Sequence, residues 1–177
     1  MNKHRFLIQQ YALKFTILLI FASCVESSAK HLEKLPQDTI LIENSIELKT
    51  YIAVTYDEQR KGLSGVMPKD FKDNEAMLFP ARRDKVRQFW MPETHMDLDI
   101  FFLSDDLYVL DVHRSLKHFE KDGPDHEVPR SKIVKCRHVL ELKSSSPLAK
   151  KIYPGMILKW KGISPLSKKE LKTRLPQ

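Results

Sequence analysis

The sequence predicts an all-β protein with one short helix, built as a compact antiparallel β-sandwich or barrel of about seven strands. The first observation is a strict alternation of apolar and other side chains over residues 46–54, which is typical of a half-buried strand. The second is a series of short apolar runs, separated by turn residues, along the rest of the chain. Short strands with turn-rich connections favour sandwiches and barrels.

The first half of the domain is expected to contain a strand, a helix and a loop. The strand over 46–54 is followed by Thr55, and Glu58 comes three residues later, which is the spacing of a capping box. This spacing predicts a short helix that runs to about Leu63 and ends with the help of nearby glycines. Residues 67–75 are rich in Pro, Asp and Asn, which predicts a loop.

Apolar runs predict the strands that follow. Residues 77–79 read as a short buried strand that stops at a proline, and residues 86–91 read as the next strand. The apolar run over 98–103 is interrupted only by Asp99, and it is expected to form a hairpin with the returning strand over 108–112.

The last part of the domain begins with the longest irregular stretch, residues 113–132. Loops of that length in a compact domain tend to be functional or mobile. Two more strands are expected, over 133–142 and 156–160. The end of the chain is basic with interspersed leucines, so we expect it to add a helical turn or two on the surface, or to fray.

Size and composition set the organisation of the chain. It has 177 residues, of which 42% are apolar and only 5 are glycine, so we expect one globular domain with a short tail or anchor. The expected divisions are a signal peptide over 1–23, a tether over 24–44, the all-β domain over 45–162 and a basic C-terminal tail over 163–177.

The first residues are typical of an export signal. Lys3, Arg5 and Lys14 precede an uncharged apolar run over residues 15–22. This run is far shorter than the roughly 20 residues that a membrane-spanning helix needs. We therefore expect the protein to be exported.

Cys24 would attach the exported protein to a membrane. Two small residues, Ala22 and Ser23, directly precede it, and this arrangement resembles a bacterial lipoprotein signal, whose cysteine is lipidated. We therefore expect a lipid anchor on Cys24 and a place in the cell envelope, on the outer membrane facing the periplasm. Two alternatives stay open: cleavage near residues 27–29 that yields a soluble periplasmic or secreted protein, and an uncleaved anchor.

Charge and cysteine content narrow the range of partners. Lys and Arg outnumber Asp and Glu by 30 to 23, but three basic residues and no acid precede Cys24, so the remainder carries a net charge of only +4. Such a mild charge argues against a nucleic-acid partner. The other thiol, Cys136, would have no disulfide partner after lipidation or loss of Cys24, and we interpret it as a small core residue. We expect a monomer.

The spaced motifs resemble the domain of unknown function 192 family (uncharacterised protein family 0127). The resemblance covers roughly residues 46–160, and its most specific part is the pair Phe89-Trp90-Met91 and Leu98-Asp99-Ile100. It implies a small all-β domain, frequent export in bacteria and no established activity. The other matching motifs are Arg60-Lys61-Gly62-Leu63-Ser64-Gly65, Ala76-Met77-Leu78-Phe79, Thr94, Phe102, Arg137, Val139-Leu140-Glu141-Leu142 and Pro154-Gly155.

This chain departs from the family's usual pattern at three places. It has Pro92-Glu93 where the family usually has Lys-Asn, Val66 where the family has Arg, and Ala76 where it has Gly. The first change replaces a cation and an amide by an imide ring and an acid. An anionic ligand that relatives bind at this bend would be bound differently here, so we expect the bend to alter specificity.

Six residues are candidates for a ligand-binding or structural polar cluster, and none is assigned a catalytic role. Asp99 and Glu141 are acids in apolar strands, where burial without a partner is costly. We expect Arg60 or Arg137 to pair with Asp99, and a structural ion pair is the alternative to a ligand site. Trp90 would either stack on a ligand or belong to the core. The full set is Arg60, Trp90, Thr94, Asp99, Arg137 and Glu141.

Metal and cofactor sites are not expected. The histidines and aspartates in and around residues 113–132 lie in a loop, where no rigid element would preorganise a zinc site. His95, Asp97 and Asp99 would share one face of a strand, an arrangement that suits a base and its orienting acids. The sequence contains no phosphate-binding glycine loop, nucleophile elbow or zinc-helix motif.

Two classes of function remain open. The first is an envelope-anchored, non-catalytic binding module for a glycan, peptide or partner protein, with a site around Trp90, Thr94, Asp99 and the 113–132 loop. The second is an enzyme that uses Asp99 or Glu141 as acid or base and an arginine to hold an anionic substrate. Two carboxylates about 5 to 10 Å apart in one cleft would favour the enzyme.

Overall fold

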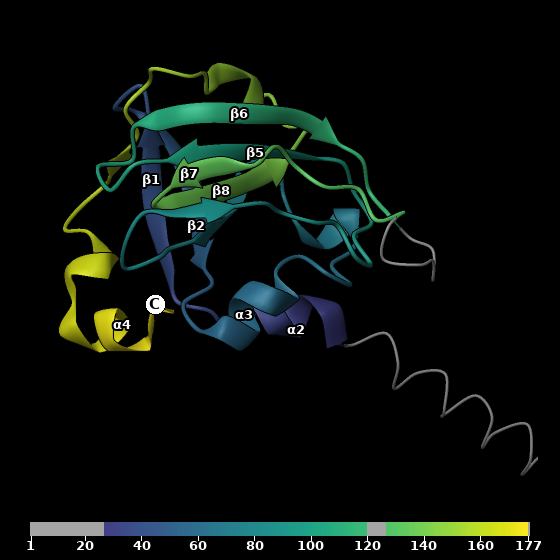
Figure 1. Ribbon diagram of the computed structural model, residues 1–177, viewed down its shortest axis with the longest axis horizontal. Coiled ribbons are helices and arrows are strands. Elements are labelled where there is room, and N and C mark those ends of the chain that lie inside the picture. Colours follow the sequence, from purple (N-terminus) through teal and green to yellow (C-terminus); the bar gives the residue numbers. More distant parts are fainter. Residues whose placement is uncertain (1–26, 120–126, 177) are drawn as a thin grey trace, which may run out of the picture.

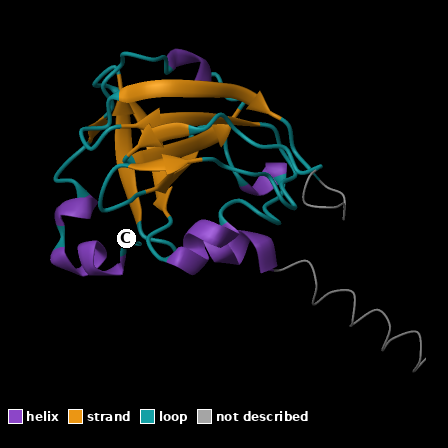
Figure 2. Ribbon diagram, viewed as in Figure 1, coloured by secondary structure: helices purple, strands orange, loops and turns teal. Residues whose placement is uncertain are grey.

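The computed structural model describes residues 27–119 and 127–176, and its main element is a curled sheet of seven strands that forms a half-barrel (Figure 1). A second sheet of two strands accompanies it. The described α-helices gather at one end of the sheet, as Figure 2 shows. The predicted all-β class is therefore confirmed.

Short strands make up both sheets. The large sheet contains β1 (Gln37–Ile42), β2 (Ile46–Ile52), β3 (Glu75–Phe79), β5 (Leu98–Leu103), β6 (Val109–Leu116), β8 (His138–Lys143) and β9 (Lys159–Trp160), in the order β6-β5-β8-β3-β2-β1-β9. The small sheet pairs β4 (Lys85–Arg87) with β7 (Val134–Cys136). The helical elements are α2 (Ser27–Glu33), α3 (Tyr56–Lys61), α4 (Lys169–Arg174), η1 (Pro68–Asp70), η2 (Ala149–Lys151) and η3 (Pro165–Ser167).

The pairing within the large sheet is antiparallel except between β2 and β3, which run parallel. A parallel pair needs a crossover connection, and the segment that contains α3 and η1 provides it. The predicted capping box starts α3: the Thr55 side chain accepts a hydrogen bond from the Glu58 amide, and the Glu58 carboxylate accepts one from the Thr55 amide.

Both faces of the large sheet are buried. Met77 and Ile100 lie in the cluster that packs on α2, the loop after α3 and the small sheet. Leu78, Phe101 and Leu140 lie in the cluster on the opposite face, which the segment around η2 covers. Because neither face meets solvent, β3 and β5 are buried at every position and lack the alternation of an exposed sheet.

The described part of the predicted tether over 24–44 is folded. Residues 27–33 form α2 and residues 37–42 form β1, which pairs with β2 along its whole length. Leu32 and Leu35 are buried against the core, which gives the segment enough apolar surface to hold it in place.

Other boundaries also differ from the predictions. The strand expected over 86–91 is limited to β4, which ends at residue 87. The expected single strand over 133–142 breaks at Arg137 into β7 and β8, which belong to different sheets. The expected loop over 113–132 begins only after β6 ends at Leu116, and residues 120–126 of that loop lie outside the described part. A β-bulge in β6 opposite Asp99 allows this strand to continue in spite of its polar residues.

The C-terminal tail packs on the domain. Leu175, which follows α4, is 7% exposed and joins Ile52 and Val54 in a small apolar cluster. Among residues 27–119 and 127–176, no helix has the length and apolar character to cross a membrane. The predicted signal peptide and the lipidation site at Cys24 lie outside the described residues.

Candidate functional site

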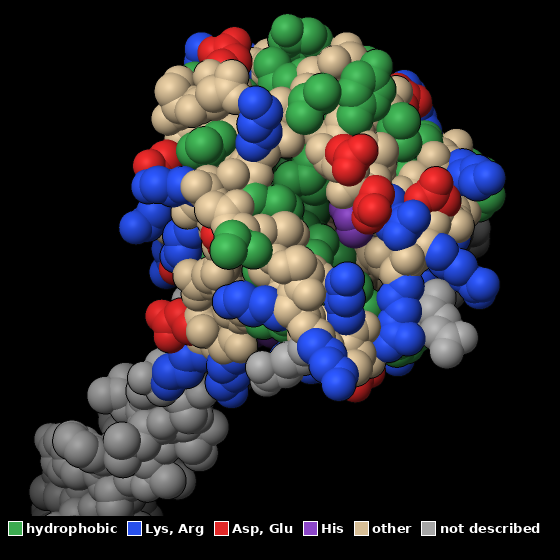
Figure 3. Space-filling view, turned by 90° about the vertical axis from the view of Figure 1, so that its left-hand side faces the viewer, with side chains coloured by type: hydrophobic (Ala, Val, Ile, Leu, Met, Phe, Trp, Pro, Cys, Tyr) green, Lys and Arg blue, Asp and Glu red, His purple; other side chains and the backbone are tan. Residues whose placement is uncertain are grey.

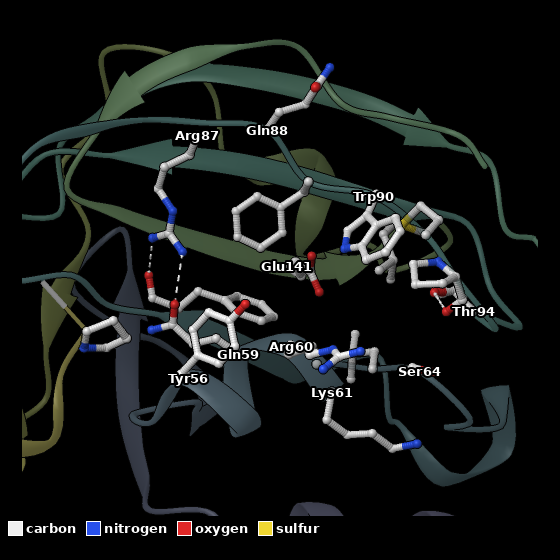
Figure 4. Close-up of a pocket in the computed structure, with 18 of the residues that line it drawn as sticks. Tyr56, Gln59, Arg60, Lys61, Ser64, Arg87, Gln88, Trp90, Thr94 and Glu141 are labelled. Atoms are coloured by element: carbon white, nitrogen blue, oxygen red, sulfur yellow. Dashed lines mark hydrogen bonds between the residues drawn. The ribbon is translucent and has the colours of Figure 1, made fainter. Parts of the chain in front are cut away.

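A pocket of about 440 Å³ opens between α3 and the segment that follows β4 (Figure 4). α3 supplies Gln59 and Arg60, the segment after β4 supplies Trp90 and Thr94, and β8 supplies Glu141. The pocket therefore combines residues from three parts of the chain that lie far apart in the sequence.

Glu141 points into this pocket from the middle of β8 (Figure 4). Its cross-strand neighbours are Met77 and Ile100, both fully buried, and Glu141 itself is 4% exposed. No group in the described part of the chain donates a hydrogen bond to its carboxyl. Burial raises its pKa to about 8, although the charge of Arg87 opposes the rise. The carboxyl is therefore mostly protonated at neutral pH and can donate a hydrogen bond.

Arg87, at the end of β4, is a buried cation in the same pocket. Its guanidinium donates to the Phe79 carbonyl (2.6 Å) and to Gln59 Oε1 (3.3 Å), and it lies 5.0 Å from the centre of the Phe89 ring. These partners are all neutral. Within the described residues no carboxylate lies within ion-pair distance of Arg87, although only 8% of the residue is exposed. A buried charge of this kind is favourable only when an anion or further acceptors complete its surroundings.

The sequence-based reasoning missed Arg87. Lys85, Arg87 and Phe89 alternate along the chain, so they share one side of an extended segment. Phe89 packs edge-on against Phe79, with ring centres 4.9 Å apart. This alternation was the available signal. It places Arg87 on the same side of the segment as Phe89, which packs against the core.

Trp90 and Thr94 form another part of the pocket wall. Trp90 is 42% exposed, and the Arg130 guanidinium lies 5.7 Å from its ring. Thr94 is buried and donates a hydrogen bond to the Pro92 carbonyl at 3.2 Å. An indole so exposed at a pocket edge is available to a ligand, and core packing does not account for it.

The bend at Pro92-Glu93 connects this wall to the loop after α3. Glu93 has a φ of +48°, in the left-handed region that asparagine and glycine tolerate better than other residues. Its carbonyl accepts a hydrogen bond from the Gly65 amide at 2.8 Å, and its carboxylate accepts one from the Ser64 hydroxyl at 2.9 Å. Because Ser64 and Pro92 both line the pocket, the bend helps to shape it.

Asp99 lies on the opposite face of the sheet, and the predicted pairing with Arg60 or Arg137 is wrong. Its carboxylate accepts hydrogen bonds from Arg114 (2.6 Å), the Ser115 amide (2.8 Å) and the Ser144 hydroxyl (2.7 Å). Arg114 and Ser115 belong to the β6 bulge. Asp99 therefore stabilises an irregularity of the sheet, and it is a structural residue.

Arg137 also lies outside the pocket. Its guanidinium donates to Asp84 (2.8 Å) and to the Arg82 carbonyl (2.5 Å), at the start of β8. Of the six candidates, the structure brings together Arg60, Trp90, Thr94 and Glu141, and it separates Asp99 and Arg137 from them.

Other residues with possible chemical roles are the group around Asp97, the thiol of Cys136 and potential metal ligands. Asp97 bonds to Lys117 and His118, whereas Asp99 bonds to Arg114, so the two acids are held by different partners. Cys136 is buried in the core, where burial raises the pKa of its thiol and keeps it protonated. In the described ranges, no group of three or more histidine, cysteine or acidic side chains could hold a metal ion.

A half-barrel sheet with a second small sheet and a few short helices places the protein among small all-β domains. The chain belongs to the DUF192 family, described as an uncharacterised ACR, whose family model matches residues 39–160. No curated protein is significantly similar to the chain.

Two solved structures share the fold. A candidate transcription regulator from Sinorhizobium meliloti is 19% identical, with a TM-score of 0.58, and the match covers 73% of this chain and 97% of the other. A protein of unknown function from Novosphingobium aromaticivorans is 23% identical, with a TM-score of 0.56, and the match covers 71% and 85%. At these identities the similarity extends to the fold alone.

Proposed function

We propose that this protein is a non-catalytic binding module of the cell envelope whose pocket accepts an acidic unit of a glycan. The observation that carries the proposal is the Glu141 carboxyl, which is buried at the pocket and receives no hydrogen bond from the described residues. Because Glu141 lines the open pocket, its carboxyl can take its hydrogen-bond partner from whatever occupies that pocket. A ligand that accepts a hydrogen bond from the protonated carboxyl would replace water there.

The charge around Glu141 favours an anionic ligand. Arg60, Lys61, Lys85 and Arg87 line the pocket, and Glu141 supplies the one carboxylate among the lining side chains of the described chain. Since burial keeps Glu141 mostly protonated at neutral pH, the pocket carries a net positive charge. Arginine binds carboxylate and phosphate groups with particular strength because its planar donors match both oxygens.

The neutral residues favour a sugar ring over a purely apolar group. Trp90 presents an exposed indole, Thr94 adds a hydroxyl to the same wall, and Tyr56 adds a hydroxyl from α3. An aromatic face packs against the C–H surface of a sugar, while the polar groups bond to its hydroxyls. The pocket volume of about 440 Å³ suits one or two sugar units and is too confined to be the main contact of a folded partner.

An enzyme remains the second candidate, because a carboxyl whose pKa lies near 8 is suited to act as a general acid at neutral pH. The paired-carboxylate arrangement is not available to it within the described residues, since Asp99 faces the opposite side of the sheet. Glu141 would have to act with Arg60 or Arg87 as the anion holder.

The binding proposal is tested by titrating the purified protein with glucuronate, galacturonate and their neutral parent sugars, followed by NMR. We expect saturable binding of the acidic sugars, with the neutral ones at least about tenfold weaker, as loss of a charge-assisted hydrogen bond implies. Trp90→Ala should weaken binding by about tenfold, given about 1 kcal/mol or more for an aromatic contact. The matched control is Tyr153→Ala, which removes an exposed aromatic outside the pocket and should leave binding unchanged.

Affinity should also fall as the pH rises above about 8 in the native protein, and this fall should be absent in Glu141→Gln, whose amide donates at every pH. The proposal fails if none of these sugars saturates, or if the Tyr153 variant loses as much affinity as the Trp90 variant. Cleavage of a glucuronide, abolished by Glu141→Gln, would instead support the enzyme.

The envelope location rests on the basic leader, the apolar run and the small residues before Cys24. A lipid on Cys24 would hold the protein at a membrane, because each buried CH₂ contributes about 0.8 kcal/mol and two or more chains anchor stably. Cys24→Ala should move the protein from the membrane fraction to the soluble fraction. Retention in the membrane fraction would exclude the lipid anchor, and a soluble native protein would support ordinary secretion.

A further inference from the structure

A second cleft, of about 490 Å³, lies between the C-terminal tail and the end of the sheet where β3 and β8 meet the turn after β5. Figure 3 shows hydrophobic side chains in a hollow of this face, with Lys and Arg side chains below it and Asp or Glu side chains at its right-hand edge. Leu166 and Leu175 of the tail and Ala81 of the turn after β3 supply apolar surface. This cleft shares no lining residue with the Glu141 pocket.

Four cations line the cleft from two sides. Lys169 and Lys172 are three residues apart on α4, so they lie on one side of that helix, and both are exposed. Neither has an ion pair or side-chain hydrogen bond with the described side chains, which do not include that of Glu170. Arg82 and Arg137 line it from the domain side. The lysine charges are therefore not neutralised by a described neighbour.

The acids near the cleft only partly offset these charges. Asp105 is the one carboxylate that lines it among the described residues; it is 68% exposed and lies 3.5 Å from Arg137. Asp84 pairs with Arg137 as well, at 2.8 Å. His138, which also approaches Asp105, stays neutral because burial lowers its pKa to about 4. Two lysines and Arg82 thus remain for a ligand.

We infer that this cleft binds the phosphate group of a phosphate monoester, either on a free small molecule or on a lipid headgroup. A phosphate monoester carries close to two negative charges and three acceptor oxygens, which suits several convergent cations better than one carboxylate does. The apolar base of the cleft would contact the organic part of the ligand. This inference is independent of the function proposed for the Glu141 pocket.

The cleft also fixes the tail. Arg82 donates to the Thr173 carbonyl at 2.7 Å, and Leu175 is buried beside it. A phosphate that bridges α4 and Arg82 would add a link between the tail and the domain. Ligand binding should therefore stabilise the docked tail by mass action.

The inference is tested with the full chain, using glycerol 3-phosphate followed by NMR and vesicles of phosphatidylcholine with and without phosphatidic acid followed by flotation. The salt concentration is kept at about 0.1 M, which screens distant charges. We expect binding of at least one phosphate probe, with shifts at the amides of residues 166–175. Lys169→Ala with Lys172→Ala should lower the affinity by about tenfold or more, as two charged contacts imply.

The matched control is Lys150→Ala with Lys151→Ala, two exposed lysines on η2 outside the cleft, which should change the affinity less than about twofold. Binding of glycerol 3-phosphate alone assigns the site to a free phosphate ester, and binding to phosphatidic acid vesicles alone assigns it to a lipid headgroup. Failure of both probes, or an equal loss in the two double variants, overturns the inference.

Discussion

Replacing Glu141 by glutamine removes the one buried acid that faces the pocket and keeps nearly the same shape. In the folded protein, burial raises the pKa of this carboxyl to about 8, whereas in the unfolded chain it returns to the ordinary value of 4.5. The folded state therefore holds a proton that the unfolded state has lost between these two values. By linkage, the free energy of unfolding of the native protein must fall as the pH rises through this window.

The size of this effect follows from the pKa difference. One pKa unit corresponds to about 1.4 kcal/mol, so the fall between pH 5 and pH 8 amounts to roughly 4 kcal/mol at most. Water that enters the pocket would solvate the ionised carboxylate and reduce the value. The glutamine variant has no such titration, so its stability relative to the native protein should rise by about 2 to 4 kcal/mol over this range.

The measurement is urea unfolding of both proteins at several pH values between about 5 and 9. The dependence of the unfolding free energy on urea concentration should be the same for both proteins, which shows that the same surface is exposed on unfolding. Titration of histidines is common to both proteins and cancels in the difference. A stability difference that stays constant across the pH range would show that Glu141 has an ordinary pKa, and the argument for a protonated carboxyl in the pocket would then be refuted.

Three further changes test other parts of the structure. Asp99→Asn should lower the free energy of unfolding by about 3 kcal/mol, because Arg114 loses its charged partner, yet leave sugar binding intact; loss of binding in a stable variant would contradict the structural role. His138→Gln should make folding less sensitive to acid. The pKa of His138 is about 4 in the folded protein and 6.5 in the unfolded chain, so the native protein loses up to about 3 kcal/mol of stability as the pH falls from 6.5 to 4. Urea unfolding over this range should show that the variant does not lose this stability. Leu175→Ala should cost about 2 to 3 kcal/mol in thermal unfolding if the tail belongs to the folded unit, and an unchanged melting temperature would show that the tail is not docked.

The sequence was most informative where local signals decide the structure. The alternation over 46–54, the capping box at Thr55 and the apolar run over 98–103 predicted β2, α3 and β5 close to their observed bounds. The predictions of strand boundaries failed where the pairing partners of a strand determine its limits. Residues 133–142 were expected to form one strand, but β7 pairs with β4, and β8 pairs with β3 and β5. The backbone therefore changes sheets at Arg137.

The same contrast applies to the candidate site. Acids in apolar strands were identified from the sequence, but Asp99 and Glu141 could not be told apart, since each is an acid among large apolar residues. The register of β5 and β8 separates them: Glu141 lies opposite Ile100, and Asp99 lies opposite Leu142. Neighbouring residues on a strand point to opposite faces, so this register places the two acids on opposite sides of the sheet.

By itself, the sequence determined the all-β class, the family and the residues that are too polar for the strands they occupy, because composition and periodicity act along the chain. Only the tertiary structure decided which of these residues have partners. Arg114 comes from the neighbouring strand to satisfy Asp99, whereas α3 and the segment after β4 close over Glu141 and bring Arg87 into its field without pairing with it. A buried ionisable group has a structural role when a neighbouring strand supplies its partner, and it is available to a ligand when none does. Strand register makes that difference here.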